Sequence, residues 1–359
     1  MAFVKERNSN LELYRILVMF SIVVHHYVVN SELFPIMCSD PFNPQSLFLY
    51  IWGMWGKTGI NCFVLITGYF MCKSEITLKK FLKLLLEVEF YEILIYLCFA
   101  LFGGNGFSLK DFIWYSLPFR TINTWSFTDG YLLFFFFIPF LNILINGMDK
   151  KRHGILLVLC LAIFSVIAKI PQIPVNLNYI FWFCIIYLIG AYFKCYPFHE
   201  GDVKFWRRSS LISLLVSILS VLVSLTLVYF LKIECRRGVV YFFVEDSNAL
   251  LAVATSVCVF MLFNSIKVKQ SKFINSVAAG TFGVLLIHDN LQIRPWLWND
   301  ILDNAQYFNS NLLYIHAIFV PIVVFVICSL IEYLRRSYLE SPILDLFYGK
   351  VQRILINRK

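Results

Sequence analysis

The feature that most constrains this chain is a series of long apolar runs, each close to the length at which a helix crosses a bilayer. Hydrophobic residues make up 59% of the 359 residues and charged residues only 15%. Soluble domains hold roughly 45–50% apolar and about 25% charged residues, so a soluble core could not bury this much apolar surface. Lipid can cover it, and a helix needs about 20 apolar residues to span the hydrocarbon core. The runs therefore predict an all-α, polytopic integral membrane protein.

About ten such runs predict about ten transmembrane helices in a single domain that covers residues 1–359. The segment 108–125 is aromatic but is interrupted by Pro118 and Arg120, so we expect an interfacial helix or loop there. Residues 333–359 are expected to form a short basic cytoplasmic tail within the domain. The expected spans lie near residues 11–30, 47–71, 81–102, 126–146, 154–170, 178–196, 209–231, 248–266, 277–293 and 311–332.

The Lys and Arg residues gather on one side of these spans. With the N-terminus in the cytoplasm, twenty-one of the 31 Lys and Arg residues lie in inside segments and seven in outside loops. Cytoplasmic loops of membrane proteins carry such an excess. The distribution predicts that both termini are cytoplasmic, and it accounts for the net charge of +9 without a nucleic-acid partner.

Most of the ten cysteines stand singly inside apolar runs, and no CxxC pair occurs. Cysteines in such positions behave as small apolar side chains. We therefore expect neither a bound metal ion nor a redox centre, and no bound cofactor.

The first span carries ionisable residues, which are costly in lipid and are therefore candidates for function. Arg15 and His26 are eleven positions apart, so they lie on nearly one face of the helix, about 16 Å apart along its axis. His25 points about 80° away from Arg15 on the same geometry. The alternative is that Arg15 extends to the inner headgroups while both histidines sit near the outer ones.

Two other spans place polar residues toward the outer side. The ninth ends in His288 and Asp289, which predicts that His288 lies near the depth of His26, with the carboxylate able to orient an imidazole. The second holds Lys57 and Asn61 and carries Tyr69 further along. Its small and hydroxyl residues could equally serve close helix packing, with Lys57 as an interface anchor.

Other functions remain open from these residues. Glu89 and Glu92 in the third span are of the kind that a proton-coupled transporter places in its helices. A transporter or flippase for lipid-linked sugars would carry polar residues along several helices, whereas here they gather in the first three spans and the ninth. A polysaccharide polymerase would carry a long outside loop with paired arginines, and Arg236 and Arg237 keep that alternative open.

The first span, NLELYRILVMFSIVVHHY, resembles the opening of membrane acyltransferase family three, the bacterial polysaccharide and lipid O-acyltransferases. That family begins with an Arg, ten residues and a His, which here are Arg15 and His26. The segments KTGINCFVLITGYF, WSFTDGYLLFFFFIPFLN, FWFCIIYLIGAYF and TFGVLLIHDN are also similar, in the expected order. The family often has an arginine pair where this chain has Lys80 and Lys83, which lack the bidentate geometry of arginine toward phosphate.

The resemblance implies an acyl-CoA donor, acetyl-CoA first, bound from the cytoplasm, and a hydroxyl acceptor on a polysaccharide or lipid-linked glycan. It also implies a multi-pass protein among the lipids of a bacterial cytoplasmic membrane. The CoA phosphates are assigned to Arg15, Lys79, Lys80 and Lys83. The general base is assigned to His26, with His288 as second candidate or as partner, and His25 is counted among the catalytic residues. The oxyanion donors are assigned to Lys57, Asn61 or Tyr69, and Asp289 is placed with them on the acceptor side. Direct transfer and a transient acyl-histidine are both compatible with these residues.

Overall fold

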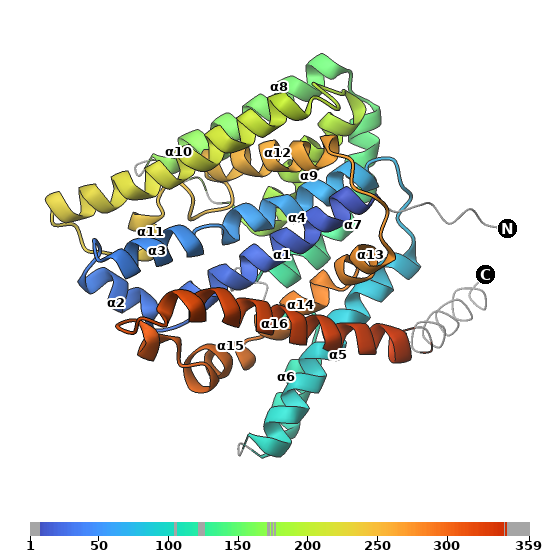
Figure 1. The fold of residues 1–359 in the computed structure, drawn as a ribbon. Coiled ribbons are helices and arrows are strands. Elements are labelled where there is room, and N and C mark those ends of the chain that lie inside the picture. The colour runs from blue at the N-terminus through green and yellow to red at the C-terminus, as the bar shows by residue number, and fades with distance from the viewer. Residues whose placement is uncertain are drawn as a thin grey trace.

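The long helices lie roughly side by side and alternate in direction along the chain (Figure 1). The computed structural model describes residues 8–103, 106–120, 126–170, 173, 175, 177–340 and 342. Within these residues the regular elements are helices, and no strand occurs among them. The N-terminal part holds α1 (Ser9–Val29), α2 (Leu33–Ser39), α3 (Pro44–Gly53), α4 (Gly56–Met71), α5 (Leu78–Phe102), α6 (Leu109–Tyr115) and α7 (Phe127–Asn146).

The C-terminal part continues the same arrangement, with π-helical or 3₁₀ turns closing several helices. It holds α8 (Lys150–Leu161, extended by η2 Ala162–Val166 and η3 Ile167–Lys169), α9 (Tyr179–Cys195), α10 (Val203–Phe230), α11 (Arg237–Val240), α12 (Leu250–Ser265), α13 (Lys272–Ala278), α14 (Thr281–His288), α15 (Ile293–Pro295), η4 (Trp296–Ile301), η5 (Asn304–Tyr307), α16 (Leu313–Arg335) and η6 (Arg336–Glu340).

Polar side chains cap the starts of many helices. Thr77 accepts a hydrogen bond from the backbone N–H of Lys80 where α5 begins, and Asn178 caps α9 in the same way. Asp202 accepts from the backbone N–H of Phe205, which lowers the pKa of this exposed carboxyl. Such caps satisfy backbone donors that have no partner within the helix, so they fix where each apolar run starts to coil.

The expected spans coincide with helices, although not all are continuous. Five helical stretches in the described part of the chain are long and apolar enough to cross a membrane on their own. The count of ten spans and the direction of the termini remain predictions. The tail beyond Glu340 lies outside the described residues, apart from residue 342. The five stretches are Ser9–Val29, Phe127–Asn146, Lys150–Lys169, Val203–Phe230 and Leu313–Glu340, and shorter apolar helices cover Tyr179–Cys195, Leu250–Ser265 and Lys272–His288.

Two expected spans are each divided into two helices. The span 47–71 is interrupted between α3 and α4, and the span 277–293 is interrupted between α13 and α14. The α4 helix packs closely on α9, because a Cβ on Gly68 would lie 2.4 Å from the carbonyl oxygen of Tyr187. Small residues permit this approach of two backbones in membrane helices.

The bundle has two chemically different ends. At one end, here called the lysine end, α1 begins, α16 finishes and α8 starts with Lys150 and Lys151 (Figure 1). At the other, the histidine end, α1 and α14 finish with His26 and His288. Near the lysine end the fully buried carboxylate of Glu332 accepts hydrogen bonds from Tyr91 at 2.7 Å and from Arg335 at 2.8 Å. Such pairing is what makes a buried charge tolerable.

Candidate active site

The side chains of His26 on α1 and His288 on α14 meet directly, with His26 Nδ1 3.0 Å from His288 Nε2. His288 Nδ1 lies 2.6 Å from the carbonyl oxygen of Val284, and a carbonyl can only accept, so Nδ1 of His288 carries the hydrogen. In the neutral ring, Nε2 of His288 is then an acceptor, and Nδ1 of His26 must donate to it. The nitrogen of His26 that remains without a hydrogen is Nε2.

Asp289 lies next to this pair and is itself held in place. Its Oδ1 is 3.5 Å from His26 Nδ1 and 2.8 Å from a terminal nitrogen of Arg294. Asn30, just after α1, also points its amide toward Oδ1, at 3.5 Å. The carboxylate therefore adds a second acceptor near the N–H of His26, and this favours the same tautomer.

His25 is positioned by the interruption between α3 and α4. Its Nδ1 lies 2.5 Å from the carbonyl oxygen of Gly53, at the end of α3, where the helix no longer supplies a partner for that oxygen. The ring packs over Gly56, where a Cβ would lie 2.3 Å from the imidazole carbons. The break thus supplies both the acceptor and the space for His25.

A cavity of about 340 Å³ opens beside these three residues at the histidine end. Both His25 and His26 line it, and no described residue supplies a hydrogen-bond partner to Nε2 of His26. Lys57 also lines the cavity, with its Nζ 2.7 Å from the hydroxyl of Tyr179. A histidine with an unpaired ring nitrogen and a lysine ammonium group therefore line one cavity, and acid–base and oxyanion chemistry need such groups side by side.

Glu92 of α5 closes the cavity on another side. It forms an ion pair with Arg120 and accepts a hydrogen bond from Asn290 at 3.0 Å. Glu89, one turn earlier, leaves a buried carboxylate oxygen without a hydrogen-bond partner. In the structure Glu92 therefore joins α5 to the segment after α14.

Asn61 and Tyr69 lie away from the cavity. The amide of Asn61 is fully buried, donates to Ser247 at 2.6 Å and accepts from the indole of Trp182 at 2.9 Å. Tyr69 lies twelve positions beyond Lys57, about 18 Å along α4, and its ring is covered by Lys194. Among the sequence candidates for oxyanion donors, the structure brings only Lys57 to the cavity.

The predicted donor residues lie toward the lysine end. Arg15 is partly exposed on α1 and pairs with Glu12 at 3.3 Å. The lysines stand at the start of α5, exposed: Lys79, Lys80, whose Nζ donates to the Glu75 carbonyl at 2.7 Å, and Lys83, which pairs with Glu340. The structure thus separates this group from the histidines by most of the length of α1.

Three features of the histidine end were not found from the sequence. Arg294, which holds Asp289, directly follows the expected ninth span and lies a helical turn beyond Asn290. Arg237 lines the cavity from α11. Cys38 and Cys235 form a disulfide across 197 positions. Both cysteines lie outside the apolar runs, and this signal could have distinguished them from the others.

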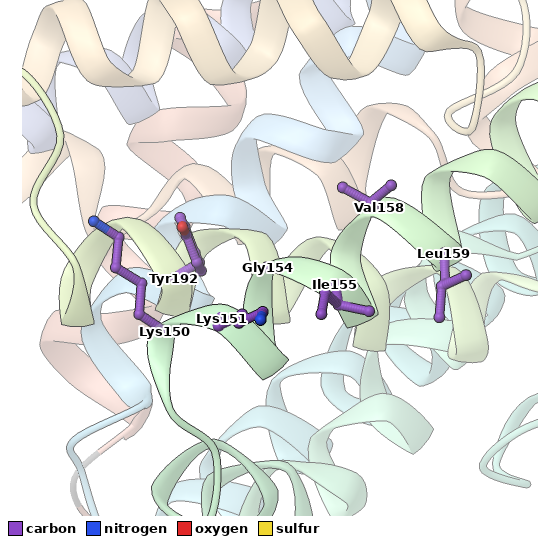
Figure 2. Close-up of a pocket in the computed structure, with 7 residues that line it drawn as sticks. All are labelled: Lys150, Lys151, Gly154, Ile155, Val158, Leu159 and Tyr192. Carbon is purple, nitrogen blue, oxygen red and sulfur yellow. The ribbon is translucent and has the colours of Figure 1, made fainter.

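A separate hollow of about 600 Å³ lies on the exposed side of α8, at the lysine end (Figure 2). Lys150 and Lys151 stand at one side of it, and the aliphatic residues Ile155, Val158 and Leu159 continue it along the helix. It contains no histidine or carboxylate, so we do not place the reaction there.

The chain was compared with known proteins. No curated protein and no solved structure matches it. A family model described as an acyltransferase domain, that of acyltransferase family three, matches residues 8–332. The matched segment includes α1 with Arg15 and His26, α14 with His288, and nearly all of α16. The chain belongs to acyltransferase family three and is a membrane acyltransferase.

Proposed function

We propose that this chain is an O-acyltransferase that moves an acyl group, acetyl in the first instance, from acyl-CoA to a hydroxyl of a cell-surface polysaccharide or lipid-linked glycan. The observation that carries the proposal is the His26–His288 pair beside the cavity, in a chain of an acyltransferase family. Transfer to a hydroxyl requires a base, and the pairing leaves one imidazole nitrogen of His26 ready to accept a proton.

In the proposed reaction, Nε2 of His26 takes the proton of the acceptor hydroxyl while the hydroxyl oxygen attacks the thioester carbonyl carbon. A C–O bond forms, the carbonyl oxygen gains negative charge, and the C–S bond then breaks. The departing CoA thiolate takes the proton back from His26. Nε2 of His288 accepts the hydrogen bond from Nδ1–H of His26 throughout and so orients the base. If Nε2 attacked first, the acyl group would instead pass through an acyl-histidine.

Lys57 is the proposed partner of the developing oxyanion. Its ammonium group has three N–H donors, one of which is directed to Tyr179 at 2.7 Å. The remaining donors can turn to an oxygen in the cavity that Lys57 lines. A donor that is already oriented in an enclosed site stabilises charge that appears only in the transition state.

The proposed orientation puts the lysine end in the bacterial cytoplasm and the histidine end outside. Arg15, Lys79, Lys80 and Lys83 would then meet the phosphates of cytoplasmic acyl-CoA. The Cys38–Cys235 disulfide lies at the histidine end, and disulfides persist in oxidising compartments such as the periplasm. This supports an acceptor that arrives from outside.

The test is acetyl transfer by the purified chain in lipid nanodiscs, with radiolabelled acetyl-CoA and a panel of glycan acceptors. We expect labelled glycan with the wild type, loss of about 10²-fold or more in kcat with His26→Ala, and a raised KM for acetyl-CoA with Arg15→Ala. His199→Ala, which removes a half-exposed histidine paired with Asp202, is the matched control and should leave kcat unchanged.

Acid quenching of the same reactions separates the two routes, because an acyl-histidine would leave label on the protein. Full activity in His26→Ala, with folding intact, would exclude the proposed base. If no acyl-CoA in the presence of any glycan gave product, transport of sugar lipids would replace acyl transfer as the function to test.

A further inference from the structure

A second hollow adjoins the catalytic cavity at the histidine end. It has a volume of about 850 Å³, and Val29 and Arg237 line both spaces. Its wall also includes Arg236, Lys169 and the ring of Phe242. We call this hollow the arginine basin. Because it shares two residues with the cavity, a long molecule that entered the basin could reach the histidines.

Where the basin meets the cavity, the polar groups of the described residues that still lack a hydrogen-bond partner are mainly donors. Arg237 is half-exposed and uses Nε to donate to Glu245 at 2.7 Å, while its two terminal nitrogens have no partner among the described residues. A guanidinium group has five N–H donors, so most of those of Arg237 remain available. The ligand that fits them is rich in acceptors.

The carboxylates at the junction, in contrast, mostly have partners, and Oε2 of Glu245, which has no hydrogen-bond partner among the described residues, is buried. Asp289 is held by Arg294, and Glu92 by Arg120. In the basin, Asp246 pairs with Lys169 and Glu245 with Arg237. Burial raises the pKa of Glu245, which lies outside the expected spans, and the neighbouring charge of Arg237 opposes this rise. A cationic ligand would therefore find few open acceptors here.

The backbone that carries the two arginines is fixed. Cys235 precedes them directly and is bonded to Cys38. On the other side of α11 the hydroxyl of Tyr241 donates to the Tyr50 carbonyl at 3.0 Å, and Val240 is fully buried. A site held on both sides in this way can present a guanidinium group in one orientation, as recognition of a planar or tetrahedral anion requires.

We propose that Arg237, with Arg236 beside it, binds an anionic group of the acceptor, a carboxylate or a phosphate, so that the arginine basin selects acidic glycans. This inference rests on the proposed function only for the statement that the bound molecule is the acyl acceptor. Phe242 lines the basin with Lys169 Nζ 5.9 Å from its ring centroid, and Arg237 lines both the basin and the cavity that His26 lines.

The test measures binding without acyl transfer, by calorimetry on the full chain in nanodiscs of zwitterionic lipid. The probes are a hexamer of galacturonic acid, a hexamer of glycerol phosphate, and maltohexaose as the neutral probe of equal length. We expect at least one acidic probe to bind at least tenfold more tightly than maltohexaose, with an affinity that falls as salt is raised.

Arg236→Ala combined with Arg237→Ala should remove this preference, whereas Arg207→Ala combined with Arg208→Ala should not, because that exposed pair lies at the lysine end of α10. Since Arg237→Ala leaves the Glu245 carboxylate unpaired, Arg237→Ala with Glu245→Gln provides a second variant that folds without that charge and should also lose the preference. Glu234→Gln, which releases Arg236, should tighten binding of the acidic probe.

Equal binding of acidic and neutral probes, or an unchanged preference in both Arg237 variants, overturns the inference. The proposed function fails separately, through the acetyl-CoA assay. If the chain binds the acidic probe through its arginines but transfers no acyl group, the anion site stands and the proposed reaction is rejected. If it transfers acyl groups to neutral and acidic glycans at equal rates, the reaction stands and the selection of acidic glycans is rejected.

Discussion

His25 and His26 line one cavity and His288 contacts His26, yet the Nδ1 atoms of the three rings have different acceptors. His25 donates to the Gly53 carbonyl and His288 to the Val284 carbonyl, whereas His26 donates to the imidazole of His288. A backbone carbonyl fixes a ring but cannot take up a proton. An imidazole acceptor can respond to charge, so the His26–His288 pair can share the positive charge that appears when His26 accepts a proton.

This difference gives a prediction for His288 as a positioning residue. His288→Ala should lower kcat by about 10²-fold while leaving the KM for acetyl-CoA unchanged, because His26 loses the acceptor that selects its tautomer. His288→Gln supplies an amide oxygen that can accept from His26 Nδ1 and should recover part of the lost rate. Steady-state kinetics on nanodisc samples checks both. A rise in the KM for acetyl-CoA, or equal loss in the Ala and Gln variants, would assign His288 a structural role.

Asn61 gives the opposite prediction, of lost stability with catalysis retained. Asn61→Ala leaves the Trp182 indole N–H and the Ser247 carbonyl buried without partners. Each such group costs about 1–3 kcal/mol, so the thermal unfolding temperature should fall clearly. At temperatures below the new transition, kcat should stay within about threefold of the wild-type value, against the 10²–10³-fold loss that removal of an oxyanion donor causes. A large loss of kcat at unchanged stability would show instead that Asn61 acts as an oxyanion donor.

At this scale the sequence indicates which residues are unusual but not what they touch. Arg15 and His26 can be identified because ionisable residues are costly inside an apolar run. The partners of Asn61 lie 121 and 186 positions away, and nothing local marks them. Arg237 looks like any basic loop residue until the fold places it on the cavity.

At the scale of elements, the breaks within α3–α4 and α13–α14 matter as much as the helices. The length of an apolar run predicts where a helix lies, since lipid tolerates only internally hydrogen-bonded backbone. The run does not predict an interruption, because the Gly53 carbonyl is satisfied by His25 from another helix. The runs 47–71 and 277–293 therefore predict the path of the chain correctly but miss both turns, of which the one between α3 and α4 positions His25.

The close contact at the first break gives a third prediction. In Gly56→Ala the new Cβ would lie 2.3 Å from carbons of the His25 ring, so the imidazole must move off the Gly53 carbonyl. We expect a loss of about 1–3 kcal/mol in stability, as for overpacking in a core, and a lower kcat because His25 packs against His26 with ring centroids 5.6 Å apart.

Gly154→Ala on α8 is the matched control for that variant. Its Cβ would make only ordinary contacts, 3.7 Å from Tyr192, and alanine favours the helix more than glycine does. Thermal unfolding and acetyl-transfer assays should therefore leave this variant at least as stable as the wild type and fully active. If Gly56→Ala were as stable and as active as Gly154→Ala, the close contact between position 56 and the His25 ring would be contradicted.

At the scale of the whole molecule, the proposed reagents meet from opposite ends. Arg15 and His26 are separated by about 16 Å along α1, so a donor held by its phosphates at the lysine end must extend its thioester through the bundle to reach the base. The acceptor, in contrast, reaches the same base through the arginine basin. The protein would then transfer an acyl group across the membrane without moving either substrate through it.

These two substrate routes require the lysine end to face the cytoplasm and the histidine end to face outside. This orientation gives the last prediction. In cells that express a chain lacking the exposed Cys98, Asn309→Cys at the histidine end should react with a membrane-impermeant maleimide, whereas Glu200→Cys at the lysine end should react only after the membrane is opened. Both positions are exposed, so accessibility within the fold does not distinguish them. The reverse pattern would put the Cys38–Cys235 disulfide in the reducing cytoplasm and the basic segments outside, against both the redox and the charge arguments. It would also leave the histidines facing the CoA pool and the lysines facing the glycans, and the proposed roles of the two ends would have to be exchanged.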